Sequence, residues 1–509
     1  MKKILVSLLP VALAATAVAQ PIDIPAPGGV GDVVALTNAL TRSDLYDTIR
    51  LAPGVYDLSD VAMEADSHLV MQSGKRLLGL GATPGETVLR GGGADVGRRI
   101  AKFGYANYSH ATASNLTFTG GYIAGLKNGG GLHGAANVLV QDCIFSNNVC
   151  GGSWQGGGGG VYMARAERCQ FIDNKVLGKN IEGDSKGSDG AYGGGLWCNS
   201  DHNLNDTADW QGAYDCVFSN CVAYTRGGGL YGRRAEGCTF VGCQATYGGG
   251  AANCVLVNST LAENRAKSWA TAAILATLDH CVVTNHQVGS FVLLNCNLNG
   301  CTIVDNYCGS EAGGVSCDTW HTDFAGANAA YTNANCIFRG NRAVLAAIVA
   351  NKTCLNCTFV ANEVGVNYGT VVSPDASHAD VVNCVFLENR AGDRLTDFNS
   401  GLGGGKGLPF LTNCVYSAAD VDPQTSARCA GCFPASRVQL RFTRRFAEAR
   451  PFEPRRVSPL MNRAFAPAWL TEALGATDVY GNPRIQFGGL DIGAAECSDL
   501  GSGGVVVIR

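Results

Sequence analysis

Residues 355–364 read Leu-Asn-Cys-Thr-Phe-Val-Ala-Asn-Glu-Val, and they contain the frame that decides the fold, Cys-x-apolar-x-x-polar. Cys357 and Phe359 stand two residues apart, so on a β-strand both side chains point to one face. A thiol and an aromatic ring on one face indicate a strand that covers a core. Ser259 takes the cysteine's place in one repeat of the frame, and ten cysteines begin the others: Cys143, Cys169, Cys216, Cys238, Cys281, Cys301, Cys336, Cys357, Cys384 and Cys414.

Most repeats carry a polar residue five positions after the cysteine. Because asparagine tolerates a left-handed backbone, we expect a turn at this position. A buried amide is costly unless it is hydrogen-bonded, and a column of asparagines solves this if each side chain bonds the next coil. Cys221, Cys243 and His286 stand there in three repeats, and seven repeats have Asn148, Asn174, Asn264, Asn306, Asn341, Asn362 and Asn389.

The repeats are short. Uninterrupted ones begin 22 residues apart between positions 216 and 238, 21 apart between 336 and 357, and 20 apart between 281 and 301. This period, with glycine-rich turns and no helical pattern, is typical of the coils of a parallel β-helix, which stack about 4.8 Å apart. We therefore predict an all-β fold, a right-handed parallel β-helix solenoid of about eleven coils with an N-terminal capping segment and a small C-terminal cap.

The ends of the chain suggest its organisation. Residues 1–19 have the charged start, apolar stretch and small-residue end of a Sec-type signal peptide. We expect residues 20–110 to form the N-terminal cap and first coils, 111–435 the β-helix repeats, and 436–509 a C-terminal cap or anchor-like segment. No later stretch has the roughly 18 apolar residues that a transmembrane helix needs. These features predict a secreted, periplasmic or cell-surface protein, which we expect to be a monomer.

Charge and cysteine content narrow the partners and the chemistry. A net charge of -4 on 509 residues argues against nucleic acid, which calls for a basic face. The 22 cysteines would suggest disulfides in an exported protein, but stacked parallel strands hold their β-carbons too far apart for bridges along a column. Cys221 and Cys243 are better bridge candidates. Cys429 and Cys432 could form a local bridge, remain free, act in redox chemistry or supply half of a zinc site.

Three resemblances to known families follow from these motifs. The stretch Asp47 to Tyr56, followed by Leu77-Leu78-Gly79-Leu80-Gly81, resembles the opening of secreted β-helix proteins of the pectin-lyase-like class. Elements such as Gly158-Gly159-Gly160-Val161 alternate with Phe-x-x-Asn, which resembles the repeat of polymorphic outer-membrane proteins. Those proteins end in a membrane β-barrel, for which too few residues follow here. The segments 478–484 and 491–496 are similar instead to the closing part of choice-of-anchor Q surface proteins.

A row of rings marks a candidate ligand-binding surface. His133, Tyr162, Trp197 and Tyr231 each follow a glycine-apolar element, at a position that faces outward on a strand. If their coils stack, they form a stripe that could bind sugars, while arginines pair with carboxylate or sulfate groups. The alternative is that the long inserts cover the stripe and make it a second small core. The arginines near these rings in sequence are Arg165, Arg168, Arg233 and Arg234.

Two inserts supply candidates for catalysis, since function concentrates on loops carried by a rigid scaffold. Acidic, histidine and aromatic residues together could serve glycan hydrolysis or elimination. The weak catalytic candidates are Asp201, His202, Asp209, Asp318, His321 and Asp323. The spacing of Asp201, Asn203 and Asn205 matches three ligands of a calcium loop, so calcium is the one possible cofactor, although the glycine and closing glutamate of that loop are missing.

These observations favour a non-catalytic surface protein. The polygalacturonase residue set is absent, and the repeats resemble those of a surface-protein family. We therefore expect an adhesin or glycan-binding scaffold whose partner is a polysaccharide or a glycan of a host or cell surface. A polysaccharide lyase or glycoside hydrolase acting on acidic or sulfated polysaccharide is the alternative, and a structural spacer is the third reading.

Overall fold

The computed structural model describes residues 19–498, with gaps. The gaps are 43–44, 105–109, 126, 136, 152–156, 179–189, 199–210, 288–290, 310–313, 319–330, 344–346, 351, 365–370, 374–379, 396, 398–409, 418–428 and 443–449. The expected signal peptide therefore lies almost wholly outside the described residues. Within them, no helix is long and apolar enough to cross a membrane.

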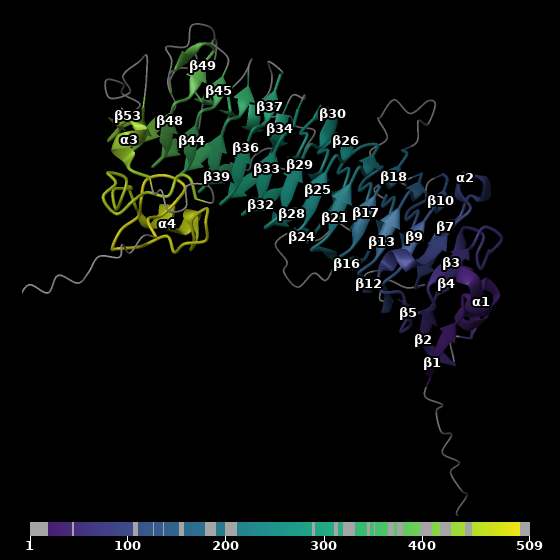
Figure 1. Cartoon of the computed structure of the whole chain (residues 1–509). Helices are drawn as coiled ribbons and strands as arrows, with labels where there is room; N and C mark the ends of the chain where they lie inside the picture. Colours follow the sequence, from purple (N-terminus) through teal and green to yellow (C-terminus); the bar gives the residue numbers. More distant parts are fainter. Residues whose placement is uncertain are drawn as a thin grey trace, which may run out of the picture.

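The described strands wind into a rod with three long parallel sheets (Figure 1). Sheet A has 16 strands from β1 (Gln20–Ile24) to β53 (Cys429–Ala430), and sheet B has 15 from β3 (Gly54–Asp57) to β54 (Phe433–Pro434). Two short sheets complete some of the coils. The predicted parallel β-helix is confirmed. The number of coils was underestimated, because the strands of residues 20–119 stack in the same sheets without carrying the cysteine frame.

Sheet C lies between the other two along each coil and has 12 strands. Its strands are β4 (Ser67–Met71), β7 (Arg99–Phe103), β11 (Leu132–His133), β15 (Val161–Tyr162), β19 (Leu196–Trp197), β23 (Leu230–Tyr231), β27 (Ala251–Ala252), β31 (Ala273–Ile274), β34 (Phe291–Leu294), β38 (Gly314–Cys317), β42 (Val349–Ala350) and β46 (Val372–Ser373).

Helices lie at the two ends of the rod. Helix α1 (Val33–Thr41) begins at Asp32, whose carboxylate accepts from the Ala35 amide, and it buries Leu36 and Leu40 over the first coil. The short helix α2 (Gly93–Val96) follows sheet B, while α3 (Arg437–Leu440) and α4 (Ala468–Leu474) belong to the C-terminal segment.

Like side chains stack along the inside of the rod. The rings of Phe171 and Phe218 are 4.7 Å apart at 5°, and those of Phe359 and Phe386 are 4.9 Å apart at 6°. The frame cysteines are buried beside them, and all 22 cysteines are free thiols in the structure, Cys221 and Cys243 among them. Each frame thiol lies near a carbonyl of the preceding coil, as Cys384 does at 3.5 Å from the Cys354 oxygen. The core is therefore a set of matched columns.

Neighbouring asparagines of the column form a hydrogen-bond ladder. Asn341 donates from its backbone and from Nδ2 to the Asn362 Oδ1 at 3.0 and 3.1 Å, and Asn362 does the same to Asn389 at 2.9 Å. Each Nδ2 also donates to the strand of the preceding coil, as Asn362 does to the Phe338 carbonyl at 2.8 Å. Asp397 ends the column by accepting from the Asn389 Nδ2 at 2.7 Å. The fully buried amides are thus satisfied by one another.

The left-handed turn lies one residue earlier than the sequence suggested. Asn147 has φ 53°, whereas the ladder residue Asn148 is not among the described residues with positive φ. A second left-handed residue precedes each frame cysteine, as Asn356 (φ 49°) precedes Cys357. Each coil therefore turns at two residues that tolerate this backbone, and the buried asparagine follows the turn.

His286 replaces asparagine within the ladder. Its ring lies between the Asn264 Nδ2, 3.3 Å from Nε2, and the Asn306 Oδ1, 3.0 Å from Nδ1. These contacts fit a neutral imidazole that donates from Nδ1 and accepts at Nε2. Complete burial lowers the pKa of His286 from 6.5 to about 4, since a charged ring would lose its hydration.

Lys352 is a lysine buried inside the core. Its side chain is 1% exposed, and Nζ donates to the Cys296 carbonyl at 2.5 Å and to the Ser316 hydroxyl at 2.9 Å. Burial lowers the pKa of Lys352. The Lys352 Nζ is surrounded by thiols and neutral dipoles. The neutral amine is therefore more favoured here than it is for a lysine in water.

The C-terminal segment folds back against the last coils. Its apolar side chains, which include Phe452, Leu460 and Ile492, form a second core with Ile337 and Val385 of the outer face of sheet B. Figure 1 shows this segment, in yellow, beside the strands that it covers.

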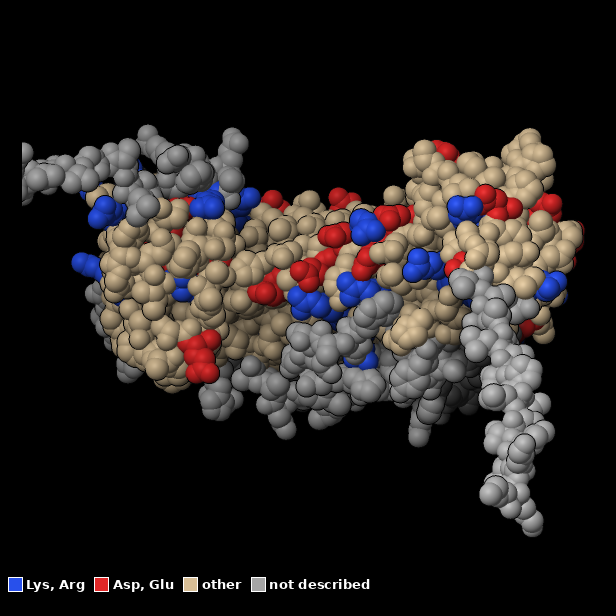
Figure 2. All heavy atoms as spheres, turned by 90° about the horizontal axis from the view of Figure 1, so that it is seen from below, with Lys and Arg blue, Asp and Glu red and all other residues tan. Residues whose placement is uncertain are grey.

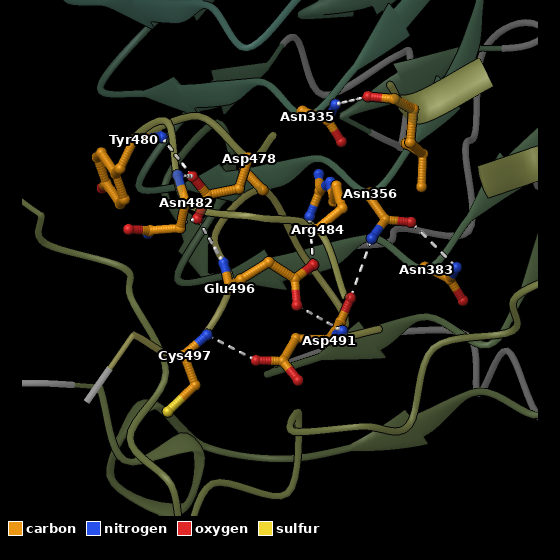
Figure 3. Close-up of polar contacts among 12 residues, drawn as sticks. Asn335, Asn356, Asn383, Asp478, Tyr480, Asn482, Arg484, Asp491, Glu496 and Cys497 are labelled. Atoms are coloured by element: carbon orange, nitrogen blue, oxygen red, sulfur yellow. Dashed lines mark hydrogen bonds and ion pairs between the residues drawn. The ribbon is translucent and has the colours of Figure 1, made fainter. Parts of the chain in front are cut away.

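The segment also docks on the left-handed corner residues, and a polar network holds it together (Figure 3). The Asn335 Nδ2 donates to the Leu474 carbonyl at 2.7 Å, and the Asn356 Nδ2 to the Asp491 carbonyl at 3.0 Å. Within the network the Arg484 guanidinium pairs with the buried Glu496 at 2.5 Å. Burial raises the pKa of Glu496 to about 8 against the opposing effect of Arg484. The residues behind the choice-of-anchor Q resemblance therefore build and attach this cap.

Replacement of His286 by asparagine tests the ladder. The unfolded chain takes up a proton near pH 6.5, but folded His286 does so only near pH 4. Stability from the neutral ring is therefore complete above pH 6.5 and is lost as the pH falls toward 4, by on the order of 3 kcal/mol. His286→Asn should remove this part of the acid-side loss, which urea unfolding of both proteins across that range would measure. Parallel stability curves for the two proteins would contradict the assignment.

Candidate functional site

The candidate ligand-binding rings lie in one column on the outer face of sheet C. The strand register aligns His133 with Tyr162, Tyr162 with Trp197, and Trp197 with Tyr231. We call these four residues the ring column. On one side the register continues to Lys102 of β7, and on the other to Ala252 of β27. Alternation along each strand places the column outside, because the preceding residues, such as Leu132 and Leu196, belong to the inner core.

The rings cover one another's faces. The rings of Tyr162 and Trp197 are 4.6 Å apart at 6°, and those of His133 and Tyr162 are 4.8 Å apart at 30°. Stacked in this way, the rings have little free face on which a sugar could lie. A column packed in this way offers a ligand the edges of its rings at most.

The middle of the ring column is a second small core. Trp197 and Tyr231 are 5% and 7% exposed, and they pack with Tyr192, Ile274 and Phe291 outside the main core. His133 and Tyr162 are half-buried. The Trp197 Nε1 and the His133 Nδ1 are buried atoms without a hydrogen-bond partner in the described part of the chain. A buried N–H that bonds nothing costs on the order of 1–3 kcal/mol, so the Trp197 indole N–H is a local cost of packing this column.

Charged residues gather at the N-terminal end of the ring column. The Lys102 Nζ donates to the Glu64 carboxylate at 2.9 Å. Arg99, 4% exposed, pairs with Asp66 at 2.9 Å and donates to the Ser67 hydroxyl at 3.0 Å. Asp66 is also 3.4 Å from the Nζ of Lys127. We call these charged side chains the charged cluster, and its three cations exceed its two carboxylates.

His133 joins the charged cluster to the rings. Burial and the nearby charges of Arg99 and Lys102 lower the pKa of His133 to about 4, while Asp66 opposes this shift. The imidazole is therefore neutral near pH 7. A neutral imidazole beside a lysine and a tyrosine can accept a proton, donate a hydrogen bond or contact a ligand oxygen.

The arginines expected to assist the rings lie elsewhere. Arg165 and Arg234 are on sheet A, in β16 (Arg165–Glu167) and β24 (Arg234–Glu236). Arg165 contacts Glu167 at 2.5 Å and stacks 3.8 Å from the ring centre of Tyr214, and Arg234 contacts Glu236 at 3.0 Å. Figure 2 shows acidic and basic side chains side by side along the rod. Two of these arginines thus face carboxylates of their own strands.

Arg233 and Arg168 are both left-handed corner residues. Arg233 is a left-handed corner residue, φ 62°, and is 6% exposed. Arg168 is bidentate with Asp142, at 2.7 and 2.9 Å. The structure therefore brings the four rings together but places these arginines at corners or on sheet A.

Most of the catalytic and calcium candidates lie outside the described residues. These are Asp201, His202, Asn203, Asn205, Asp209, His321 and Asp323. Asp318 is described, and it follows β38, half-buried, with its amide donating to the Ala350 carbonyl at 3.1 Å. Across the described ranges no three acidic, histidine or cysteine side chains are grouped so as to hold a metal ion.

Sequence reasoning missed the charged cluster. Residues 64–102 lie before the first cysteine frame, so the repeat gave no register for Lys102. The alternation of Ala101, Lys102 and Phe103 was the available signal, because a lysine between two apolar residues of a strand faces outward.

Comparison with known proteins gives structural likeness only. No protein family matches the chain, and no curated protein matches its sequence. The A-module of the mannuronan C-5 epimerase AlgE6 of Azotobacter vinelandii is 13% identical, with TM-score 0.32, covering 79% of this chain and 95% of that one. Tailspike protein 3 of bacteriophage CBA120 is 10% identical, with TM-score 0.37, and coverages of 79% and 58%. Pectate lyase Pel9A is 11% identical, with TM-score 0.30, and coverages of 94% and 97%. Likeness at this level carries no argument about what the chain binds or does.

The pKa of His133 tests the geometry of the charged cluster. Removing the Lys102 charge should raise this pKa above about 4, because one of the cations that disfavour the charged ring is lost. NMR titration of the histidine ring signals in the wild type and in Lys102→Gln would measure the change. Lys175→Gln, at an exposed position on β18 (Lys175–Val176), is the matched control and should leave it unchanged. A wild-type value near 6.5 would contradict the buried, cation-flanked position.

Proposed function

We propose that this protein binds an acidic polysaccharide along the outer face of sheet C and does not cleave it. The ring column and the charged cluster form the binding face. The observation that carries the proposal is the charged cluster at the end of the ring column, in which Lys102, Arg99 and Lys127 face two carboxylates. An exported adhesin or glycan-binding scaffold on the cell surface is the role that fits such a rod.

The chemistry of the face favours an anionic, hydroxyl-rich ligand. Lys102, Arg99 and Lys127 outnumber the two carboxylates beside them, so the end of the column carries excess positive charge. A carboxylate or sulfate group would bind there through charge-assisted hydrogen bonds. Its sugar hydroxyls would lie against the half-buried side chains of His133 and Tyr162.

The repeat of the scaffold suits a polymer. Successive rings are 4.8 and 4.6 Å apart, so equivalent edges recur along the rod. A chain of sugars lying along the column would meet several such edges at once, and weak contacts would add through multivalency. Arg165 and Arg234 are outside the proposed face, because they lie on sheet A and contact carboxylates there.

Binding measurements with two variants test the proposal. Tyr162→Phe keeps a stacked ring but removes its hydroxyl, and Lys102→Gln removes a cation. Each should weaken binding to polygalacturonate, alginate or a sulfated mucin-type polymer by about tenfold, the value of one good polar contact. Isothermal titration calorimetry at low salt would measure the affinity, with neutral dextran as the ligand control.

Arg234→Gln on sheet A is the matched control and should bind as the wild type does. Thermal unfolding should show that both sheet C variants are folded at the temperature of the binding measurement. Equal loss of binding in the sheet A variant, or wild-type affinity in both sheet C variants, would overturn the proposed face.

A second candidate function is polysaccharide cleavage, as a lyase or hydrolase. Its support is the neutral His133 between Lys102 and Tyr162, an arrangement in which a base and a cation share one site. Turnover of an acidic polymer that is lost in His133→Gln, or on changing Asp201, His202 or His321, would favour it. A structural spacer predicts neither binding nor turnover.

A further inference from the structure

Two Cys-x-x-Cys pairs occupy equivalent places in different coils. Cys354 and Cys429 share one inner column of sheet A, since the register aligns Cys354 with Val381, Val381 with Leu411, and Leu411 with Cys429. Cys357 and Cys432 stand three residues later, in the column of frame cysteines. A left-handed residue precedes the second cysteine of each pair, Asn356 at φ 49° and Gly431 at φ 71°. The backbone therefore presents both pairs in the same way.

Exposure separates the two pairs. Cys354 and Cys357 are fully buried in the interior of the rod. Cys429 and Cys432 lie at its C-terminal end, where β53 and β54 are the last strands of sheets A and B. Of the 22 cysteines, all of them in the described part of the chain, Cys429 alone is half-buried and the others are buried. A soluble oxidant therefore has its most direct access at Cys429.

The terminal thiols touch one another. Cys432 is hydrogen-bonded to Cys414 of the preceding coil and to Cys429 across the corner. Neighbours in one column, such as Cys414 and Cys432, have parallel Cα–Cβ bonds that hold their β-carbons near the strand spacing. Cys429 and Cys432 come from different faces of the corner and are free of this restriction. The contact across the corner is thus the one that fits a bond.

We propose that Cys429 and Cys432 are a site of disulfide formation, which low-molecular-weight disulfides such as oxidised glutathione convert to a bridge across the last corner of the solenoid. The buried pair Cys354 and Cys357, equivalent in backbone, stays reduced. The bridge would tie β53 to the turn before β54, at the end of the rod that has no further coil to cover it.

The reaction is an ordinary thiol–disulfide exchange in two steps. The Cys429 sulfur, as thiolate, attacks one sulfur of oxidised glutathione, and the S–S bond breaks to release one glutathione thiolate. Cys432 then loses its proton and attacks the Cys429 sulfur of the mixed disulfide, which forms the protein bridge and releases the second glutathione. The protein pair is oxidised by two electrons and glutathione disulfide is reduced by two. The hydrogen bond with Cys414 and burial raise the pKa of Cys432, so the second step is the slower one.

Differential alkylation of the full chain tests the site. The folded protein is incubated with oxidised glutathione, its remaining thiols are alkylated after unfolding, and the peptides are identified by mass spectrometry. The expected product is a peptide that carries Cys429 and Cys432, lacks two hydrogens and resists alkylation, while Cys354 and Cys357 are alkylated completely. A bridge between Cys414 and Cys432, a bridge between Cys354 and Cys357, or complete alkylation of Cys429 and Cys432 would overturn the proposal.

Two serine variants separate loss of the disulfide from loss of the fold. In Cys354→Ser the terminal bridge should form at the wild-type rate, because the pairs are in separate coils. In Cys429→Ser the bridge should be abolished and Cys432 should remain alkylatable, since its own sulfur is buried. Circular dichroism of both variants should match the wild type, because a polar side chain, Asn333, already occupies the column of Cys354 and Cys429. If Cys432 in Cys429→Ser were oxidised at the wild-type rate, this would contradict the proposal that Cys429 reacts first with oxidised glutathione.

Discussion

The fold depends on hydrogen bonds that satisfy its buried amide groups. A coil of some twenty residues must turn sharply at several corners, and the turn from sheet B leaves backbone donors facing the core. The asparagine ladder satisfies them, because each Oδ1 accepts from the backbone and the side chain of the coil before it. That bonding pattern works only if every coil puts the same group at the same height. The stacks of phenylalanine rings and thiols follow from the register that the amides impose.

The same register produces the candidate binding face. Once coils stack in register on the inside, outward residues of successive strands are also brought into line, as His133, Tyr162 and Trp197 are. Rings so close together stack on each other and bury the middle of their own column. The fold thus stacks these aromatic residues so that their faces are covered and only their edges are left. Under the proposed function, recognition on this rod would rest on the charge at the end of the column more than on open aromatic faces.

The cysteine frame made the core predictable. The parts of the chain that lack the frame could not be placed from sequence. Cys357, Phe359 and Asn362 recur with fixed offsets, so their columns and the parallel β-helix could be inferred from sequence. The strands before residue 120 pair in the same sheets without that frame, which is why the coil number and Lys102 were missed. The left-handed residue could not be separated from its neighbour Asn148, since asparagine suits both a turn and a ladder. Arg165 and Arg234 are near the rings in sequence, but a corner places them on another sheet.

The coupling between adjacent ladder amides tests this account most directly. A double-mutant cycle on Asn341→Ala and Asn362→Ala, measured by urea unfolding, compares the sum of the single losses with the loss in the double variant. The account predicts a coupling of about 1 kcal/mol or more, because one side chain accepts two bonds from the other residue. Asn148→Ala combined with Asn362→Ala, in coils that do not touch, should be additive. Additivity within about 0.3 kcal/mol for the adjacent pair would contradict the claim that the ladder holds the coils in register.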